Sequence, residues 1–311
     1  MTLSAGCVHE DATKPERAAL SKSKPATNQP FPTAPAKEAS PPPTIPPIHY
    51  DPLPDATASV VASWFEELGP VREGESFGQL ITRIARARVG TPYFNPKQSD
   101  APETLDARVD SFQCVSLVET SLSLARCTWA GMPVPECYQR ELISTRYRDG
   151  HLDGYSSRLH YFYDWIGDNA RRERLAVMTN PLGGRASPRR FKIMTKNPNL
   201  YPALQDPLIL AQMGSIEDEL NREGPSWIHR NDITHAKSQL KEGDIIGIVG
   251  NQPGLLIIHT GFITVAPDGT KRYLHASSHH ERVVLTPDDI QDYVFRERRR
   301  RGIVVARPLA P

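Results

Sequence analysis

The sequence has few cysteines, no long apolar run and almost no net charge. Its four cysteines in 311 residues are too few for a scaffold held together by disulfides. No stretch approaches the roughly 20 apolar residues that span a bilayer, so the sequence contains no transmembrane helix. The 37 basic and 36 acidic residues nearly cancel, and the net charge of +1 provides no general attraction to nucleic acid or anionic lipid.

The N-terminal segment is poor in large apolar side chains and rich in proline, alanine, lysine, serine and threonine. A segment of this composition cannot bury enough apolar surface to offset the entropy lost on ordering. We therefore expect residues 1–55 to be a disordered, partly polyproline tether. The remainder, residues 56–311, has the composition of a single globular domain.

The start of the sequence, Leu3-Ser4-Ala5-Gly6-Cys7, resembles the lipobox at which a lipoprotein is cleaved and its cysteine acylated. The leucine lies four residues before the cysteine rather than three, and an apolar region does not precede it. Two interpretations stay open. In one, a lipid on Cys7 attaches the protein to the membrane at the periplasmic face of the cell envelope; in the other, Cys7 is a chance cysteine in an ordinary N-terminus.

Helices are expected in the first half of the domain. Residues 59–68 and 77–89 have apolar side chains at helical spacing, and the second run is followed by Gly90-Thr91-Pro92-Tyr93, which stops a helix. A third helix is predicted over residues 111–130, with Ser111 as its N-cap and a glycine just after its end.

The last third of the sequence consists of short runs rich in β-branched residues, separated by glycine, proline and aspartate. These runs are residues 243–249, 255–265, 271–277, 282–285 and 302–306. Helices followed by a series of antiparallel strands predict an α+β fold rather than an alternating, doubly wound one.

Cys114 is the candidate nucleophile. With Ser111 as N-cap it is the third helical residue, in the first turn, where free backbone N–H groups and the helix dipole favour an anion. This position lowers the pKa of a thiol and so favours the reactive thiolate. The alternative is a small, buried helical cysteine. For Cys127 and Cys137 the sequence leaves open whether they pair with each other or remain buried thiols.

Two histidines, His259 and His275, lie inside neighbouring predicted strands, where an unpaired imidazole is costly. The connection Ala266-Pro267-Asp268-Gly269-Thr270 suits a three-residue loop that ends with glycine in the left-handed region. Pairing the first and last residues of this connection places His275 opposite Gly261. Both imidazoles then share one face as diagonal neighbours, about 7–8 Å apart at the backbone.

This register predicts a relay between His259 and His275 that points to the Cys114 end of the helix. Gly261 leaves room between the two rings. The alternative is two independently satisfied histidines in the core.

These elements together carry a family resemblance. Residues 90–93, 113–119, 258–261 and 274–277 resemble the corresponding motifs of the NlpC-type cysteine peptidases, which are papain-like cell-wall hydrolases. The resemblance implies a papain-like fold for residues 56–311, a single catalytic domain. In this fold N-terminal helices, with the nucleophile at a helix N-terminus, pack on a C-terminal antiparallel sheet or barrel.

The resemblance also implies the catalytic roles. The cysteine at the helix N-terminus, the strand histidine and the polar residue on the next strand match Cys114, His259 and His275. Cys114 attacks the carbonyl to give a thioester, His259 takes the thiol proton and later activates water, and His275 orients His259. Tyr93 matches a tyrosine that lies by the active site. Neither a cofactor nor a metal is implied.

A narrower resemblance covers about residues 77–307. Residues 146–150, 157–161, 164–169 and 191–195 are similar to a branch described as N-acetylmuramoyl-L-alanine amidase-like. This resemblance implies hydrolysis of the bond between N-acetylmuramic acid and L-alanine in peptidoglycan fragments.

Within this branch five residues are candidates for lining the substrate cleft, because aromatic faces and charged groups suit sugar and peptide recognition. They are Arg158, His160, Tyr161, Asp164 and Trp165. The alternative is a scaffold role, with Tyr161 and Trp165 in the core and Arg158 paired with Asp164.

Other functions remain to be weighed. The wider superfamily mostly cuts between D-Glu and the diamino acid. Another alternative is a catalytically inactive wall-binding module. The feature in its favour is Gln113, which stands where the family commonly has aspartate. His275, His279 and His280 resemble a metal-ligand cluster, but the sequence lacks a His-Glu-x-x-His helix and paired cysteines, so we expect residues 279–280 in a solvated turn. Residues 296–301, rich in arginine, are expected to be a solvated helix end rather than a nucleic-acid site.

Overall fold

The computed structural model of the protein describes residues 50–95 and 102–311. The fold is formed by the part of the chain from Leu53 onwards. Cys7 and the predicted tether up to residue 49 lie outside the described residues, so the tether and the lipid attachment stay predictions. Among the helices that the structure describes, none is long and apolar enough to cross a membrane.

Two helices open the fold, α1 (Asp55–Leu68) and α2 (Phe77–Arg86). Helix α2 begins with a capping box: the Ser76 hydroxyl accepts a hydrogen bond from the Gln79 N–H, and the Gln79 side chain accepts one from the Ser76 N–H. Both helices lie where the sequence predicts them, with α2 ending three residues earlier than expected.

Helix α3 (Cys114–Trp129) is almost completely enclosed, and α4 (Pro135–Arg146) packs beside it. A disulfide between Cys127 and Cys137, with a Cα–Cα distance of 5.9 Å, joins the two helices and answers the question that the sequence left open. The predicted start of α3 is wrong: Gln113, not Ser111, precedes the first helical residue, and its backbone is extended with φ −102° and ψ 172°.

The middle of the chain contains elements that the sequence did not predict. The helices here are α5 (Phe162–Arg171), α6 (Ile193–Lys196), α7 (Pro207–Glu223) and α8 (Ile233–Lys237). The strands are β1 (Leu175–Val177), β2 (Arg185–Ala186) and β3 (Ser226–His229). Single 3₁₀ turns occur at Arg148–Gly150, Tyr155–Ser157, Pro198–Leu200, Pro202–Gln205 and Arg230–Asp232.

The C-terminal third forms most of one antiparallel sheet. Its elements are β4 (Ile245–Val249), β5 (Ile257–Val265), β6 (Lys271–Ser277), β7 (Arg282–Asp289), α9 (Ile290–Phe295) and β8 (Gly302–Pro308). The strand order is β2-β3-β8-β4-β5-β6-β7, and β1 also pairs with β8. Helices followed by an antiparallel sheet confirm the α+β prediction.

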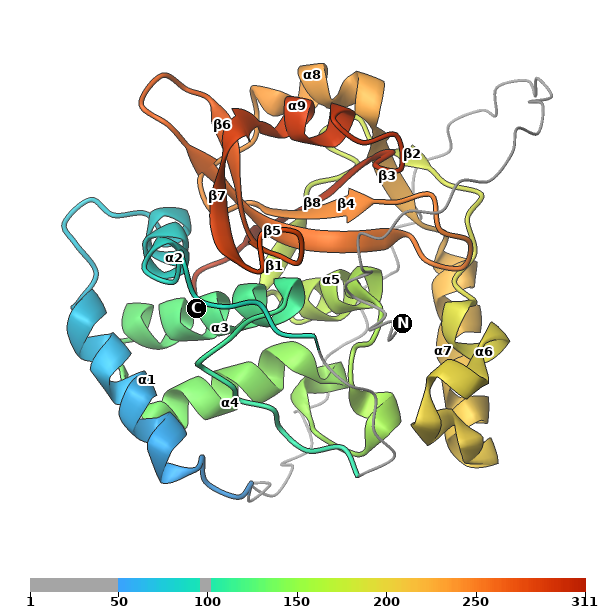
Figure 1. The fold of residues 1–311 in the computed structure, drawn as a ribbon, viewed down its shortest axis with the longest axis horizontal. Coiled ribbons are helices and arrows are strands. Elements are labelled where there is room, and N and C mark those ends of the chain that lie inside the picture. Colours follow the sequence, from blue (N-terminus) through green and yellow to red (C-terminus); the bar gives the residue numbers. More distant parts are fainter. Residues whose placement is uncertain (1–49, 96–101) are drawn as a thin grey trace, which may run out of the picture. The chain divides into compact units, whose positions relative to one another are not determined.

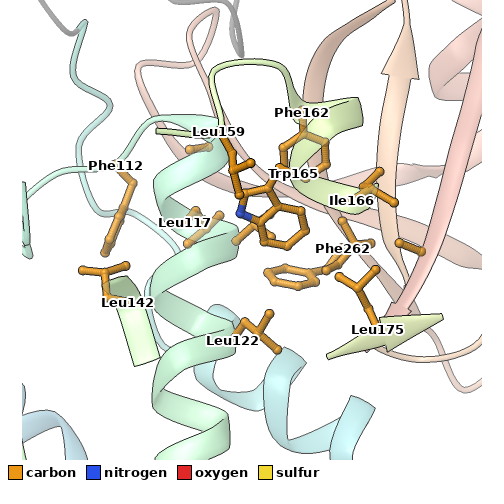
Figure 2. Close-up of a cluster of buried hydrophobic side chains, with 14 of the residues drawn as sticks. Phe112, Leu117, Leu122, Leu142, Leu159, Phe162, Trp165, Ile166, Leu175 and Phe262 are labelled. Atoms are coloured by element: carbon orange, nitrogen blue, oxygen red, sulfur yellow. The ribbon is translucent and has the colours of Figure 1, made fainter. Parts of the chain in front are cut away.

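Both faces of the sheet are covered (Figure 1). One face packs against α3 and its neighbours, and Figure 2 shows Leu117 and Leu122 of α3 beside Phe262 of β5 and Trp165 of α5. The other face forms a second apolar cluster with α8 and α9, to which Ile263 of β5 belongs. Because side chains alternate along a strand, β5 contributes to both clusters.

Candidate active site

The β5–β6 hairpin has the register that its loop chemistry predicts. The Ala266 N–H donates to the Thr270 carbonyl at 2.9 Å, and the Gly269 N–H donates to the Ala266 carbonyl at 2.8 Å. Gly269 has a φ of 85°, in the left-handed region that glycine adopts without steric cost. Phe262 lies opposite Leu274, so the predicted register is confirmed.

The register brings the two strand histidines together. His259 Nε2 lies 2.7 Å from His275 Nδ1, and the two rings are perpendicular with centroids 4.7 Å apart. A Cβ atom on Gly261 would lie 2.8 Å from the Cβ of His275 and 2.5 Å from the Leu274 carbonyl oxygen. The shared face and the room left by Gly261 are therefore confirmed, and the alternative of two independent histidines is wrong.

Aromatic rings enclose the histidine pair. The Tyr273 ring stacks on His275 with centroids 4.8 Å apart, and the Tyr293 ring lies 5.4 Å from His275. The Arg300 guanidinium lies over the Tyr293 ring at 3.8 Å. These contacts place the pair on the face of the sheet that α9 covers, where His275 is buried and His259 is half-buried.

Burial is the main cause of the pKa shifts at the pair. It lowers the pKa of His259 to about 3, with the Arg300 and Arg299 charges adding to the effect. Burial also lowers the pKa of His275 well below its usual value, followed by the effects of His259, Arg300 and His280. Both imidazoles are therefore neutral at pH 7, the state in which one ring donates a hydrogen bond to the other.

The arginine-rich run after α9 is only partly solvated. Arg296 and Arg298 are exposed, but Arg300 is only 6% exposed and donates to the Tyr293 carbonyl at 2.6 Å. The expectation of a solvated helix end is wrong for Arg300, because the aromatic ring of Tyr293 and a main-chain carbonyl hold its guanidinium inside the protein.

Cys114 is the first residue of α3 rather than the third, and it is completely buried. Helix α3 contacts both β5 and β6, the strands that carry the histidines. The histidine side chains project from the sheet face that α9 covers, whereas α3 packs on the other face, so the expected approach of the pair to the Cys114 thiol stays a prediction.

The predicted active-site tyrosine, Tyr93, is half-buried beside the entry to α3. The Tyr93 N–H donates to the Glu281 carbonyl at 2.8 Å, on the turn that precedes β7. On its other side, the Phe112 N–H donates to the Pro92 carbonyl at 2.9 Å. The Gly-Thr-Pro-Tyr segment thus lies between the β6–β7 turn and the residues that lead to Cys114.

Three of the predicted cleft residues are in the interior. Tyr161 donates to the buried Glu217 carboxylate at 2.6 Å, Asp164 pairs with Arg148 at 2.5 Å, and Trp165 is fully buried. The prediction that they line the cleft is corrected to the scaffold alternative, because side chains without access to solvent do not reach a substrate.

Arg158 and His160 are half-buried at the edge of the same region. Arg158 pairs with Glu103 at 3.2 Å, so the suggested pairing with Asp164 is wrong. His160 Nε2 lies 2.8 Å from the Tyr155 carbonyl oxygen, and its ring lies 4.3 Å from that of Tyr155. Burial lowers the pKa of His160 to about 3, with Arg158 as the next cause.

A cavity of about 50 Å³ opens at the histidine pair, and a second cavity of about 780 Å³ adjoins it. Two residues, Asn251 and Gln252, line both of them. Neither residue was predicted from the sequence, although both lie in the loop directly before the strand that carries His259.

The other histidines of the suggested metal cluster, His279 and His280, are exposed in the turn after β6, as expected. Within residues 50–95 and 102–311, the structure contains no group of three or more histidine, cysteine, aspartate or glutamate side chains that could hold a metal ion.

Comparison with known proteins relates this chain to one sequence family and to several solved structures. Residues 83–303 match the family described as N-acetylmuramoyl-L-alanine amidase-like. An N-acetylmuramoyl-L-alanine amidase from Bacteroides uniformis has a similar structure, with a TM-score of 0.69 and 28% identity over 75% of this chain and 98% of that chain. A search of curated proteins gives no match.

Two further structures are similar. A Bacteroides fragilis protein, provisionally described as a xylanase, has a TM-score of 0.65 and 31% identity over 72% of this chain and 98% of that one. A Legionella pneumophila protein at 21% identity has a TM-score of 0.62, covering 82% of this chain and 95% of that one. The second likeness concerns the fold alone.

Proposed function

This chain belongs to the N-acetylmuramoyl-L-alanine amidase-like family, and on that premise we propose that it hydrolyses the N-acetylmuramoyl-L-alanine bond of muropeptides through a thioester on Cys114. The observation that carries the proposal is the 2.7 Å contact between His259 Nε2 and His275 Nδ1. This contact occupies one nitrogen of His259 and leaves Nδ1 as the atom that accepts the thiol proton. In this proposal Cys114, His259 and His275 form a triad of the NlpC, papain-like type.

The tautomers follow from this assignment. For Nδ1 of His259 to accept a proton, Nε2 must carry the hydrogen and donate it to His275 Nδ1. The neutral His275 then has its own hydrogen on Nε2. His275 lines the cavity of about 50 Å³, which has room for a water molecule to accept that hydrogen. The lowered pKa values of both histidines keep the pair in this neutral state before the reaction.

The reaction proceeds in two halves. The reduced Cys114 thiol gives its proton to His259 Nδ1 while the sulfur attacks the lactyl carbonyl carbon. The C–N bond breaks, His259 returns the proton to the departing L-alanine amine, and a thioester remains. Water then gives a proton to His259 and attacks the thioester, which releases the muramoyl carboxylate and restores the thiol. His275 stabilises the His259 imidazolium in both halves.

A glycosidase function has less support, even though one structural neighbour is provisionally described as a xylanase. Glycoside hydrolysis generally requires two carboxyl groups on opposite sides of the scissile bond. The side chains that line the cavity at the histidine pair include neither aspartate nor glutamate. The chemistry available there is that of an imidazole pair.

The proposal is tested with defined muropeptides, digested in the presence of a thiol reductant and analysed by mass spectrometry. A free L-alanine amine on the released peptide supports the proposal, whereas cleavage between D-Glu and the diamino acid would replace it with an endopeptidase function. Cys114→Ala should abolish turnover, and Cys127→Ala with Cys137→Ala should retain it. If the reduced wild-type protein binds muropeptides without cleaving them, the chain is a wall-binding module, in which Gln113 replaces the family's aspartate.

For location, we propose the periplasmic face of the cell envelope. The support is the lipobox-like sequence that ends in Cys7 and the proposed peptidoglycan substrate. Incorporation of a labelled fatty acid into the wild-type protein, and its loss in Cys7→Ala, would test the attachment.

A further inference from the structure

The cavity of about 780 Å³ beside the histidine pair has a strongly basic lining. It lies between the segment that contains α6 and the loop that joins β4 to β5. Four cationic side chains line it, together with polar, apolar and small residues, and none of the lining residues is acidic. The cations are Arg189, Arg190, Lys192 and Lys196.

The cations differ in how far they are already neutralised. Lys192 pairs with Asp218 at 2.8 Å. Arg190 is exposed and makes one bond, from Nη1 to the Asn221 carbonyl at 2.9 Å. Lys196 is exposed and has no acidic partner among the residues that the structure describes. Positive charge is therefore available at Arg190 and Lys196 for an anionic ligand.

The walls of the cavity are bound to each other. The Lys192 and Ile193 N–H groups both donate to the Gly254 carbonyl, at 3.1 and 3.2 Å. Gly254 has a φ of 80°, and a Cβ atom there would lie 2.8 Å from the Ile193 nitrogen. This close backbone contact holds the β4–β5 loop against the start of α6.

The buried carboxylate of Glu217 binds the backbone of α6, on one side of the basic cavity. Glu217 of α7 is fully buried and accepts hydrogen bonds from the Met194 and Thr195 N–H groups, both at 3.2 Å, and from the Thr195 hydroxyl. The same carboxylate accepts the Tyr161 hydroxyl at 2.6 Å. The backbone that carries the basic side chains is thus hydrogen-bonded to α7.

The basic cavity adjoins the cavity at the histidine pair, because Asn251 and Gln252 line both of them. A ligand that occupies the basic cavity can therefore belong to the same molecule that reacts at His259. In an N-acetylmuramoyl-L-alanine amide the lactyl carboxyl is consumed in the bond, so the sugar side has no free carboxylate. The peptide side keeps the free carboxylates of its acidic residue and its C-terminus.

We propose that the basic cavity binds the carboxylates of the peptide half of the substrate through Arg190 and Lys196, an inference that rests on the proposed amidase function. It orients the substrate so that the sugar half extends past the histidine pair and the peptide half leaves through the basic cavity. Recognition is electrostatic and weakens as salt screens the exposed charges.

The test compares two matched muropeptides, one with free peptide carboxylates and one with the same carboxylates amidated. Wild-type protein should show a KM about tenfold lower for the free acid, with similar kcat. Lys196→Ala and Arg190→Ala should each raise KM for the acidic substrate by about three- to fivefold and leave the amidated one unchanged. Lys241→Ala, which removes an exposed lysine outside the cavity, is the control.

The outcomes separate the inference from the proposed function. Cleavage of both substrates with equal KM, unaffected by either substitution, overturns the inference and leaves the amidase function standing. If the wild-type protein cleaves neither substrate, calorimetric titration of Cys114→Ala with the two muropeptides still decides the inference by their difference in Kd. Competitive inhibition by inorganic phosphate that is lost in Lys196→Ala, without discrimination between the substrates, would assign the cavity to a phosphoryl ligand instead.

Discussion

Replacing Gly261 with alanine should separate the two strands that carry the histidine pair. The added Cβ would lie 2.5 Å from the Leu274 carbonyl oxygen and 2.8 Å from the His275 Cβ. Carbon atoms are most favourably about 3.5 Å apart, so β6 has to move by roughly 0.7 Å relative to β5. Both obstructing atoms belong to or adjoin the main chain, and a change of side-chain rotamer does not relieve the contact.

The magnitude follows from overpacking and from the geometry of the relay. Insertion of a methyl group into a close-packed site costs about 1–3 kcal/mol of the free energy of unfolding. A displacement approaching 1 Å at a catalytic pair lowers kcat by up to about 100-fold. We therefore expect the Gly261→Ala protein to fold and to lose most of its turnover.

The assay combines denaturant unfolding with kcat measurement on a defined muropeptide. Gly214→Ala is the matched control, because it lies inside α7 with nothing within 4 Å of the added Cβ. That substitution should stabilise the protein by about 0.5–1 kcal/mol and leave kcat unchanged. A Gly261→Ala protein with wild-type stability and turnover would refute the idea that this glycine sets the spacing of the relay.

The remaining predictions concern the histidines and the disulfide. His275→Ala should lower kcat with little change in KM, and His275→Asn should be milder because an amide still bonds His259; equal losses in both variants would contradict an orienting role. Because burial lowers the pKa of His259 and His160 from 6.5 to about 3, the unfolded chain binds more protons between these values, and stability should fall as the pH decreases from 6.5 towards 3. The free energy of unfolding, measured by denaturant titration at several pH values in that range, should depend less steeply on pH in His160→Asn than in the wild-type protein. Removing the Cys127–Cys137 disulfide, which spans 10 residues, should cost about 3 kcal/mol without changing kcat in the folded protein.

The sequence allowed the hairpin to be predicted closely because its register depends on five consecutive residues. The geometry of residues 266–270 determines which face of the sheet each β6 side chain points to, including His275. The start of α3 was less predictable. The Ser111 hydroxyl bonds its neighbour Asp110 at 2.9 Å instead of capping the helix, while the next residue, Phe112, pairs with Pro92, far away in the sequence.

The cleft was harder to predict than the relay because it depends on contacts between distant segments. Tyr161 bonds Glu217, which lies 56 residues later, and such a partner turns a candidate ligand into a core residue. The basic cavity likewise combines residues 189–200 with residues 251–254, two loop-like stretches without a shared periodicity. Composition alone does not bring these stretches together.

Because both faces of the sheet are covered, its central strands should open to solvent only rarely. Strands β4 and β5 are internal to the sheet and enclosed on both sides, so we expect their amide hydrogens to exchange with solvent only when the whole domain unfolds. Helix α6 has four residues and the β4–β5 loop lies at the surface, so their amides should exchange through local opening. The site would then combine a chemical half, whose backbone hydrogen bonds open only on global unfolding, with a binding half, whose backbone hydrogen bonds open locally while the protein stays folded.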